Sequence, residues 1–217
     1  MKISKYVDHT NLKPIATKAD IEKLCRDAAK YDFASVCVNP CDVALAKELL
    51  KGTGVNVCTV IGFPLGRNTT GIKVAETKDA LAAGCDEFDM VVNVGKIKDR
   101  DLDYVRNEIA AVVAAAQGKI VKVIIETGLL TDEEKILATK ASCEAGASFV
   151  KTCTGFSAGA ATAEDVALMK ANCTPSVKVK ASAGIRTWED AMKLIEAGAE
   201  RLGTSAGIAI VEGEPKA

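Results

Sequence analysis

The sequence is poor in aromatic residues and in histidine, and these shortages exclude several kinds of function. Aromatic side chains make up 4% of the 217 residues, and His9 is the single histidine. No Cys-x-x-Cys pair occurs among the eight cysteines, so the usual ligand spacings of zinc sites are missing. The formal net charge is −1 and both signs are mixed along the chain, which argues against nucleic acid or an anionic membrane as a partner.

The chain also lacks the long apolar segments of membrane and secreted proteins. No run approaches the roughly 18 apolar residues of a membrane span, and the N-terminal segment has no signal-peptide core. We therefore expect a cytoplasmic protein whose cysteines are free thiols. Most of them lie in apolar segments, where a thiol behaves as a small hydrophobic side chain. Cys153 is the candidate for an exposed thiol, because it follows Lys151 by two residues.

What the chain has in abundance is one repeated unit, a short β-branched run followed by an amphipathic stretch. The near-continuous apolar character of these runs predicts strands buried on both faces, and hence a parallel sheet. Thr-x-x-Asp/Glu capping boxes predict helix starts, and Ala-Gly phrases predict left-handed helix stops. The predicted strands are Tyr6–Asp8, Ser35–Asn39, Val55–Ile61, Glu87–Asn93, Lys119–Glu126, Phe149–Thr152, Val177–Ala181 and Arg201–Thr204; the boxes begin at Thr17, Thr131, Thr162 and Thr187, and the stops are Gly84, Gly146 and Gly198.

Eight strand–helix units without a linker or a low-complexity segment predict one compact (β/α)8 barrel domain over residues 1–217. An open, doubly wound sheet is the competing architecture. Two observations argue against that sheet. No Gly-x-Gly-x-x-Gly follows the first strand, and reactive side chains end many different strands.

Charged side chains occur where the strands of a barrel would end, which is where barrel enzymes place their catalytic groups. Isolated buried charges cost several kcal/mol each, so such groups must pair or react. Lys151 and Lys180 occupy corresponding positions on adjacent strands, about 4.8 Å apart in a parallel sheet. Two ammonium groups so close disfavour double protonation, which predicts that Lys151 is a Schiff-base nucleophile. The charged and polar residues of this set are Asp8, Asn39, Asp89, Lys122, Glu126, Lys151 and Lys180.

Asp89 is expected to face the same cavity and to move protons, through water. Lys122 precedes Glu126 by four residues, so both side chains are expected on one face of a strand. The alternative interpretation is structural: the lysines reach the barrel rim, or they pair with Asp89 and Glu126 without reacting.

Two glycine-rich loops are candidates for a phosphate site. They follow the seventh and eighth predicted strands, and loops at these positions of barrels frequently bind phosphate through backbone N–H groups. Ordinary turns use the same residue types, so that alternative stays open. The candidate phosphate-binding residues are Gly184, Gly203, Thr204 and Ser205, with Thr154 and Gly155 from the preceding loop.

Eight ordered motifs, which together span nearly the whole chain, resemble those of the deoxyribose-phosphate aldolases, a family of class I, Schiff-base-forming aldolases. The motif around Lys151 reads Phe-Val-Lys-Thr-Cys-Thr-Gly. The motifs are Asp8–Leu12, Val36–Pro40, Ile61–Gly66, Glu87–Val91, Lys122–Thr127, Phe149–Gly155, Lys180–Thr187 and Arg201–Ser205.

The resemblance implies reversible cleavage of 2-deoxy-D-ribose 5-phosphate to D-glyceraldehyde 3-phosphate and acetaldehyde, in deoxyribonucleotide breakdown. By position, Lys151 matches the imine-forming lysine, Lys180 the second lysine that lowers its pKa, Asp89 the aspartate of the proton relay and Lys122 the lysine associated with it. Neither a metal nor a cofactor is implied, because the iminium is itself the electron sink. Gly184, Gly203 and Ser205 fall where the family holds the phosphate.

Two departures concern the phosphate. The family often has Gly-Gly where this chain has Ala183-Gly184, and some relatives have a lysine where this chain has Phe156. A homodimer or homotetramer is expected, because such barrels often associate through their outer helices. Another Schiff-base aldolase, a sugar-phosphate isomerase and a non-catalytic binding protein are the competing functions.

Overall fold

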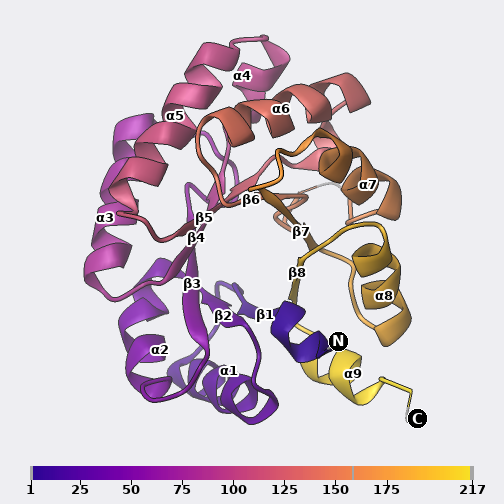
Figure 1. Ribbon diagram of the computed structural model, residues 1–217. Coiled ribbons are helices and arrows are strands. Elements are labelled where there is room, and N and C mark those ends of the chain that lie inside the picture. The colour runs from indigo at the N-terminus through magenta and orange to yellow at the C-terminus, as the bar shows by residue number, and fades with distance from the viewer. Residues whose placement is uncertain (1, 158, 216–217) are drawn as a thin grey trace.

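The computed structural model describes residues 2–157 and 159–215, and it is a closed barrel of eight parallel strands surrounded by helices (Figure 1). Each strand pairs with the next in chain order, and β8 closes the barrel by pairing with β1. The predicted (β/α)8 barrel is therefore confirmed, and the open sheet is excluded. The strands are β1 Val7–Asn11, β2 Ser35–Val38, β3 Asn56–Ile61, β4 Glu87–Val91, β5 Ile120–Ile124, β6 Phe149–Lys151, β7 Lys178–Ser182 and β8 Arg201–Thr204.

Only the eighth strand has the predicted bounds; the others differ by one to three residues at an end, and the differences in β1 and β5 affect the interpretation of the site. The first strand was predicted at Tyr6–Asp8, but Tyr6 ends a 3-10 helix and β1 continues to Asn11. The fifth was predicted to reach Glu126, but β5 ends at Ile124. Glu126 has a left-handed backbone with φ 59°, which no strand accommodates, so the expectation that Lys122 and Glu126 share one strand is wrong.

The helices begin at the predicted capping residues. Thr17, Thr131 and Thr187 form complete capping boxes, whereas Thr162 caps alone because the Asp165 carboxylate binds Lys135 instead. The predicted stops at Gly84, Gly146 and Gly198 all have positive φ. The helices are α1 Lys18–Tyr31, α2 Val43–Leu49, α3 Thr70–Ala82, α4 Val94–Lys98, α5 Leu102–Ala115, α6 Asp132–Glu144, α7 Ala163–Asn172, α8 Trp188–Glu196 and α9 Gly207–Glu212, with 3-10 turns η1 Ile3–Tyr6, η2 Pro40–Asp42 and η3 Thr127–Leu129.

Alternation along the strands separates an apolar layer from a charged interior. In β4, Phe88 and Met90 belong to the main hydrophobic core, while Glu87 and Asp89 take part in ion pairs across the barrel. In β5, Val121 and Val123 flank the charged Lys122 in the same way. Side chains of a strand point alternately to its two faces, so the apolar set packs against the helices and the charged set fills the barrel.

All eight cysteines are free thiols, as expected. Cys153, the candidate for an exposed thiol, is fully buried, and its sulfur lies 3.5 Å from the Thr127 hydroxyl. No helix in the described part of the chain is long and apolar enough to cross a bilayer.

His9, the single histidine, lies in the first strand and is buried. Its ring packs against Phe33 with 5.1 Å between centroids, and Nδ1 has no hydrogen-bond partner among the described residues. Burial lowers the pKa of His9 to about 4, with Asp27 raising it and Lys23 lowering it by smaller amounts. His9 is therefore neutral at pH 7.

This low pKa predicts a pH dependence of stability. The unfolded chain takes up a proton at His9 near pH 6.5, and the folded chain does so only near pH 4. The contribution of His9 to the free energy of unfolding is therefore fully present above pH 6.5 and is lost as the pH drops toward 4. Between pH 7 and pH 5 we expect the contribution of His9 to fall by about 2 kcal/mol. Urea unfolding of the wild type and of His9→Gln at both pH values measures it: the wild type should lose about 2 kcal/mol more. Equal losses would show that His9 is protonated in the folded protein.

Candidate active site

Asp89, in the middle of β4, is the centre of a charged cluster inside the barrel. Its Oδ2 accepts hydrogen bonds from Lys151 Nζ and Lys180 Nζ, each at 2.7 Å. Its Oδ1 accepts one from Lys122 Nζ at 2.8 Å. The four residues that the sequence suggested as catalytic groups are therefore in direct contact around one carboxylate.

Strand register explains this convergence. Asp89 lies beside Lys122 across β4 and β5, and Lys151 lies beside Lys180 across β6 and β7. All four point inward, because each alternates with an apolar residue that faces the helices. The curvature of the barrel then brings the two pairs together across its interior.

A second layer of carboxylates lies below Asp89, toward the amino ends of the strands. Asp8 of β1 binds Lys180, and Glu87 of β4 binds Lys122 with 2.6 Å between Oε2 and Nζ. Arg201 Nη1 joins the two acids, 2.6 Å from Asp8 and 3.1 Å from Glu87. Sequence reasoning had noted Asp8 without giving it a role and had missed Glu87 and Arg201. The alternation of Glu87 with Asp89 along one strand was the available signal.

The charges of this cluster stabilise one another. Burial opposes ionisation of Asp89, but Lys122, Lys151 and Lys180 outweigh it and hold the pKa of Asp89 well below its usual range. Burial likewise opposes the charges of Lys122 and Lys180. The attraction of the surrounding carboxylates outweighs burial, so the pKa values of both amines are raised. Lys122 and Lys180 are therefore permanent cations at neutral pH.

Lys151 differs from the other two lysines in its contacts. It has one carboxylate partner, Asp89, whereas Lys180 has two and Lys122 has three. The described cluster holds four cationic groups, counting Arg201, and three carboxylates. Loss of one proton balances these charges, and Lys151 is the cation with the fewest ion pairs. Of the lysine amines in the cluster, that of Lys151 is thus the one with the fewest carboxylate contacts.

A cavity of about 350 Å³ opens at the carboxyl end of the barrel with Lys151 in its lining. Lys122, Lys180 and Asp89 lie beneath the surface of this cavity, fully buried. Of the three lysines, Lys151 alone is thus placed to meet a substrate. All candidate phosphate-binding residues line the same cavity: Thr154, Gly155, Gly184, Gly203, Thr204 and Ser205.

Several of these residues also have structural roles. The Thr154 hydroxyl donates to Glu126, and the Thr204 hydroxyl donates to the carbonyl of Ile185. A Cβ on Gly203 would lie 3.1 Å from Lys180 Cε, so glycine here lets the Lys180 side chain pass. One alternative interpretation was that the lysines form purely structural ion pairs with Glu126. The structure does not support it, because Glu126 accepts its hydrogen bonds from Thr154.

Both departures from the family pattern lie at this cavity. Ala183 has φ 76°, a left-handed conformation that costs a residue with a Cβ about 1 kcal/mol or more and suits glycine. Phe156 is 53% exposed and meets Phe63 edge to face, with 5.2 Å between ring centroids. Lys13 and Arg186, two cations that sequence reasoning had not selected, line the cavity as well.

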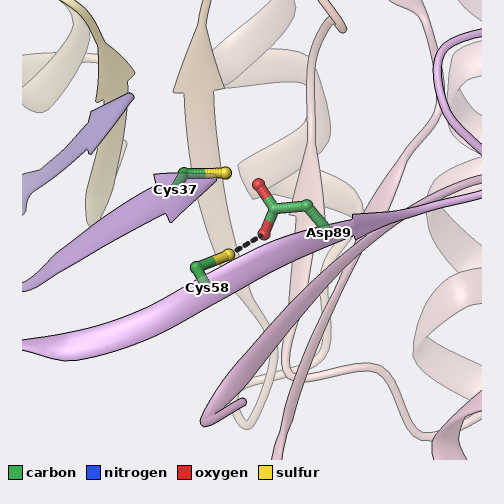
Figure 2. Close-up of side chains that lie close together, drawn as sticks. All are labelled: Cys37, Cys58 and Asp89. Carbon is green, nitrogen blue, oxygen red and sulfur yellow. Dashed lines mark hydrogen bonds between the residues drawn. The ribbon is translucent and has the colours of Figure 1, made fainter. Parts of the chain in front are cut away.

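Among the described residues, one group of side chains has donor atoms close enough to bind a metal: Cys37, Cys58 and Asp89, whose donor atoms all lie within 4.8 Å of one another (Figure 2). The carboxylate is already bound by three ammonium groups, however. A divalent cation would have to displace at least one of them and would be repelled by the others. The donor set therefore does not suit a metal.

Comparison with known proteins agrees with this geometry. The family model described as "DeoC/LacD family aldolase" matches residues 2–213. The deoxyribose-phosphate aldolase of Bacillus cytotoxicus is 60% identical over 217 residues, which cover 100% of this chain and 97% of that protein. That of Clostridium perfringens strain SM101 is 58% identical over 98% of this chain and 96% of its own length. The structure of the tetrameric Aeropyrum pernix deoxyribose phosphate aldolase superposes with TM-score 0.90 at 34% identity, over 97% of this chain and 89% of that one.

The fold and the lysine-lined cavity define an enzyme of the (β/α)8-barrel type. The chain belongs to the DeoC/LacD family of aldolases. The resemblance to deoxyribose-phosphate aldolases that the sequence motifs indicated is thereby confirmed.

The buried cluster predicts that Lys122 is needed for stability. Lys122→Met leaves Glu87 and Asp89 without their shared cation, which should lower the free energy of unfolding by about 3–5 kcal/mol. The control is Lys170→Met, which removes an exposed ion pair with Glu200 and should cost less than about 1 kcal/mol. Urea unfolding at pH 7 measures both. Similar small losses in the two variants would mean that the cluster does not depend on Lys122.

Proposed function

We propose that the protein cleaves 2-deoxy-D-ribose 5-phosphate reversibly to D-glyceraldehyde 3-phosphate and acetaldehyde, through a Schiff base on Lys151. The observation that supports this most strongly is the placement of Lys151. Its amine is the one lysine amine of the Asp89 cluster that lines the cavity, with permanently charged Lys122 and Lys180 behind it. The names of the curated relatives support the substrate.

In the first stage, the neutral amine of Lys151 attacks the aldehyde carbon C1 of the open-chain sugar. The carbinolamine then loses water to give an iminium ion. Asp89, bonded to Lys151 Nζ, takes part in moving the protons, directly or through water. The adjacent Lys180 ammonium favours the neutral form of Lys151 before attack and stabilises negative charge on the departing oxygen.

In the second stage, the bond between C2 and C3 breaks as the C3 hydroxyl loses its proton. The bonding electrons move into the iminium and form an enamine, and glyceraldehyde 3-phosphate leaves. Protonation of the enamine at C2 and hydrolysis of the imine release acetaldehyde and restore Lys151. Lys122 acts on this sequence only through Asp89, by holding that carboxylate ionised and in place.

We place the phosphate against the loops that follow β6, β7 and β8. Arg186 supplies a positive charge that the sequence-based prediction did not include, and Ala183 narrows the approach where relatives have glycine. The proposed phosphate-binding residues are Thr154, Gly155, Gly184, Gly203, Thr204 and Ser205, with Arg186.

In its wider setting, we place the reaction in the cytoplasm, in deoxyribonucleotide breakdown, and expect a homo-oligomer. The Aeropyrum pernix relative is described as a tetramer, which supports assembly. A sugar-phosphate isomerase would act on similar ligands without releasing acetaldehyde.

Lys151→Leu should abolish cleavage of 2-deoxy-D-ribose 5-phosphate and leave the fold intact, because the amine is the reacting group. The loss should exceed about 10⁴-fold in kcat, as for removal of other covalent nucleophiles. Coupled assays that detect glyceraldehyde 3-phosphate and acetaldehyde separately measure it. The control is Lys178→Leu on β7, an exposed lysine paired with Glu200, which should keep wild-type activity. Substantial activity in Lys151→Leu would show that another group is the nucleophile.

Lys180→Leu should shift the pH–rate profile of cleavage to higher pH. Without the neighbouring ammonium group, Lys151 holds its proton to higher pH, so the rate at pH 7 falls and recovers partly as the pH rises. The profile of kcat/KM between pH 6 and 9.5 tests this, with circular dichroism to confirm folding. A lower rate with an unchanged profile would assign Lys180 to structure or to substrate binding.

A further inference from the structure

The Cys58 thiol lies within the charged cluster and is not part of the main apolar core. Its sulfur is 3.2 Å from Asp89 Oδ1 and 3.2 Å from Lys122 Nζ. The S–H group donates to the carboxylate, and the sulfur accepts from the ammonium group. Cys58 thus bridges Asp89 and Lys122, the two residues proposed to supply and maintain the proton relay, beside their direct hydrogen bond.

Cys37 lies directly beside Cys58. The two residues are register partners on the adjacent strands β2 and β3, and their sulfur atoms are within 4.8 Å of one another. Figure 2 shows both side chains pointing toward Asp89. Adjacent parallel strands are about 4.8 Å apart, within the roughly 4.4–6.8 Å between Cα atoms that a disulfide spans. Side-chain rotation alone can therefore bring the sulfurs into bonding distance.

The thiol pair lies one side chain away from the substrate cavity. Leu12 lines the cavity and packs against Cys37, Cys58 and Val60 in a small apolar cluster. Leu12 thus connects the cavity lining to the two thiols. The other pair of neighbouring cysteines, Cys143 at the end of α6 and Cys173 after α7, lies in the helical layer outside the barrel.

We propose that Cys37 and Cys58 form an oxidation site, at which a peroxide converts the two thiols into a disulfide and thereby interrupts the Asp89 proton relay. The formation of the bond follows from the geometry of the strands alone. Its effect on catalysis rests on the function proposed above.

The reaction is a two-electron oxidation in two steps. Cys37 attacks one oxygen of hydrogen peroxide, the O–O bond breaks, and the products are a sulfenic acid on Cys37 and one water. The Cys58 sulfur then attacks the Cys37 sulfur, the S–O bond breaks and a second water leaves with the Cys58 proton. Both thiols are oxidised, and the peroxide is reduced to two molecules of water.

The order of attack follows from the environments of the two sulfurs. The S–H of Cys58 has three acceptors within reach: Asp89 Oδ1, the Thr59 carbonyl oxygen and the Cys37 sulfur. Donation to Cys37 lowers the pKa of the Cys37 thiol, whereas burial raises the pKa of Cys58 well above its ordinary value. Because the thiolate is the nucleophile, Cys37 reacts first and Cys58 resolves the sulfenic acid.

The disulfide changes the surroundings of Asp89 directly. The bonded sulfurs have no proton, so Asp89 Oδ1 loses the S–H donor, and the S–S bond of about 2.05 Å draws Cys58 toward β2 and away from Lys122. Activity should therefore fall on oxidation and return on reduction. The expected loss in kcat is at least tenfold.

The test is peroxide treatment of the full-length protein, followed by digestion under non-reducing conditions and mass mapping. We expect a peptide that links Cys37 to Cys58, a loss of aldolase activity that parallels its formation, and recovery of both with dithiothreitol. Cys58→Ala and Cys37→Ala should each form no such link and should lose activity more slowly, relative to their own untreated rates. A Cys143→Ser/Cys173→Ser double variant is the matched control and should respond as the wild type does.

The linked peptide and the aldolase activity test separate parts of the proposal. Absence of the linked peptide at a peroxide dose that oxidises Cys143 or Cys173 would overturn the oxidation site, whatever the protein catalyses. Formation of the link with unchanged aldolase activity would overturn its effect on the relay. If the untreated protein lacks aldolase activity, the proposed function fails, and the mass map still decides whether the disulfide forms.

Discussion

The site depends on one interaction, the hydrogen bonds from three ammonium groups to the carboxylate of Asp89. A buried ion costs several kcal/mol, and three lysines inside a barrel repel one another. Asp89 contacts all three, so it removes most of that repulsion at one point. Lys180 forms a further ion pair with Asp8, and Lys122 forms one with Glu87, so both positive charges are offset by a second carboxylate. Without these carboxylates the barrel would need apolar residues in place of the lysines, and it would have no amine to react.

The cluster is asymmetric, because Lys151 has fewer ion pairs than Lys122 and Lys180 and is the one of the three that lines the cavity. Lys122 and Lys180 are fully buried and have several carboxylate partners, which fixes both their charge and their position. Lys151 is 4% exposed, has one partner and lines the cavity. A neutral amine there leaves equal numbers of positive and negative groups. Charge balance and access to the cavity thus favour the same residue as the proposed nucleophile. The thiols of Cys37 and Cys58 lie next to Asp89, the carboxylate that binds Lys151.

The barrel and the central contacts were predictable from the sequence, because parallel strands end at one edge and their register is regular. That is why Lys151 and Lys180 could be placed side by side before the structure was known. Glu87 and Arg201 were not predicted, because they lie at the amino ends of their strands, whereas barrel enzymes place catalytic groups at the carboxyl ends. The left-handed turn at Glu126 and the unpaired ring of His9 were also unpredictable, since both depend on packing between distant segments. The position of Arg186 in the cavity lining could not be predicted either, because a loop sequence does not show which of its side chains face the cavity.

The central claim is that, of the three lysines on Asp89, Lys151 alone forms the imine. The direct measurement is reduction with borohydride in the presence of acetaldehyde, followed by cleavage with a protease that does not depend on lysine and mass mapping of the peptides. The account predicts one ethyl group, attached to Lys151, with Lys122 and Lys180 unmodified. An adduct on Lys180 or Lys122, or no adduct in a protein that cleaves the sugar phosphate, would contradict it.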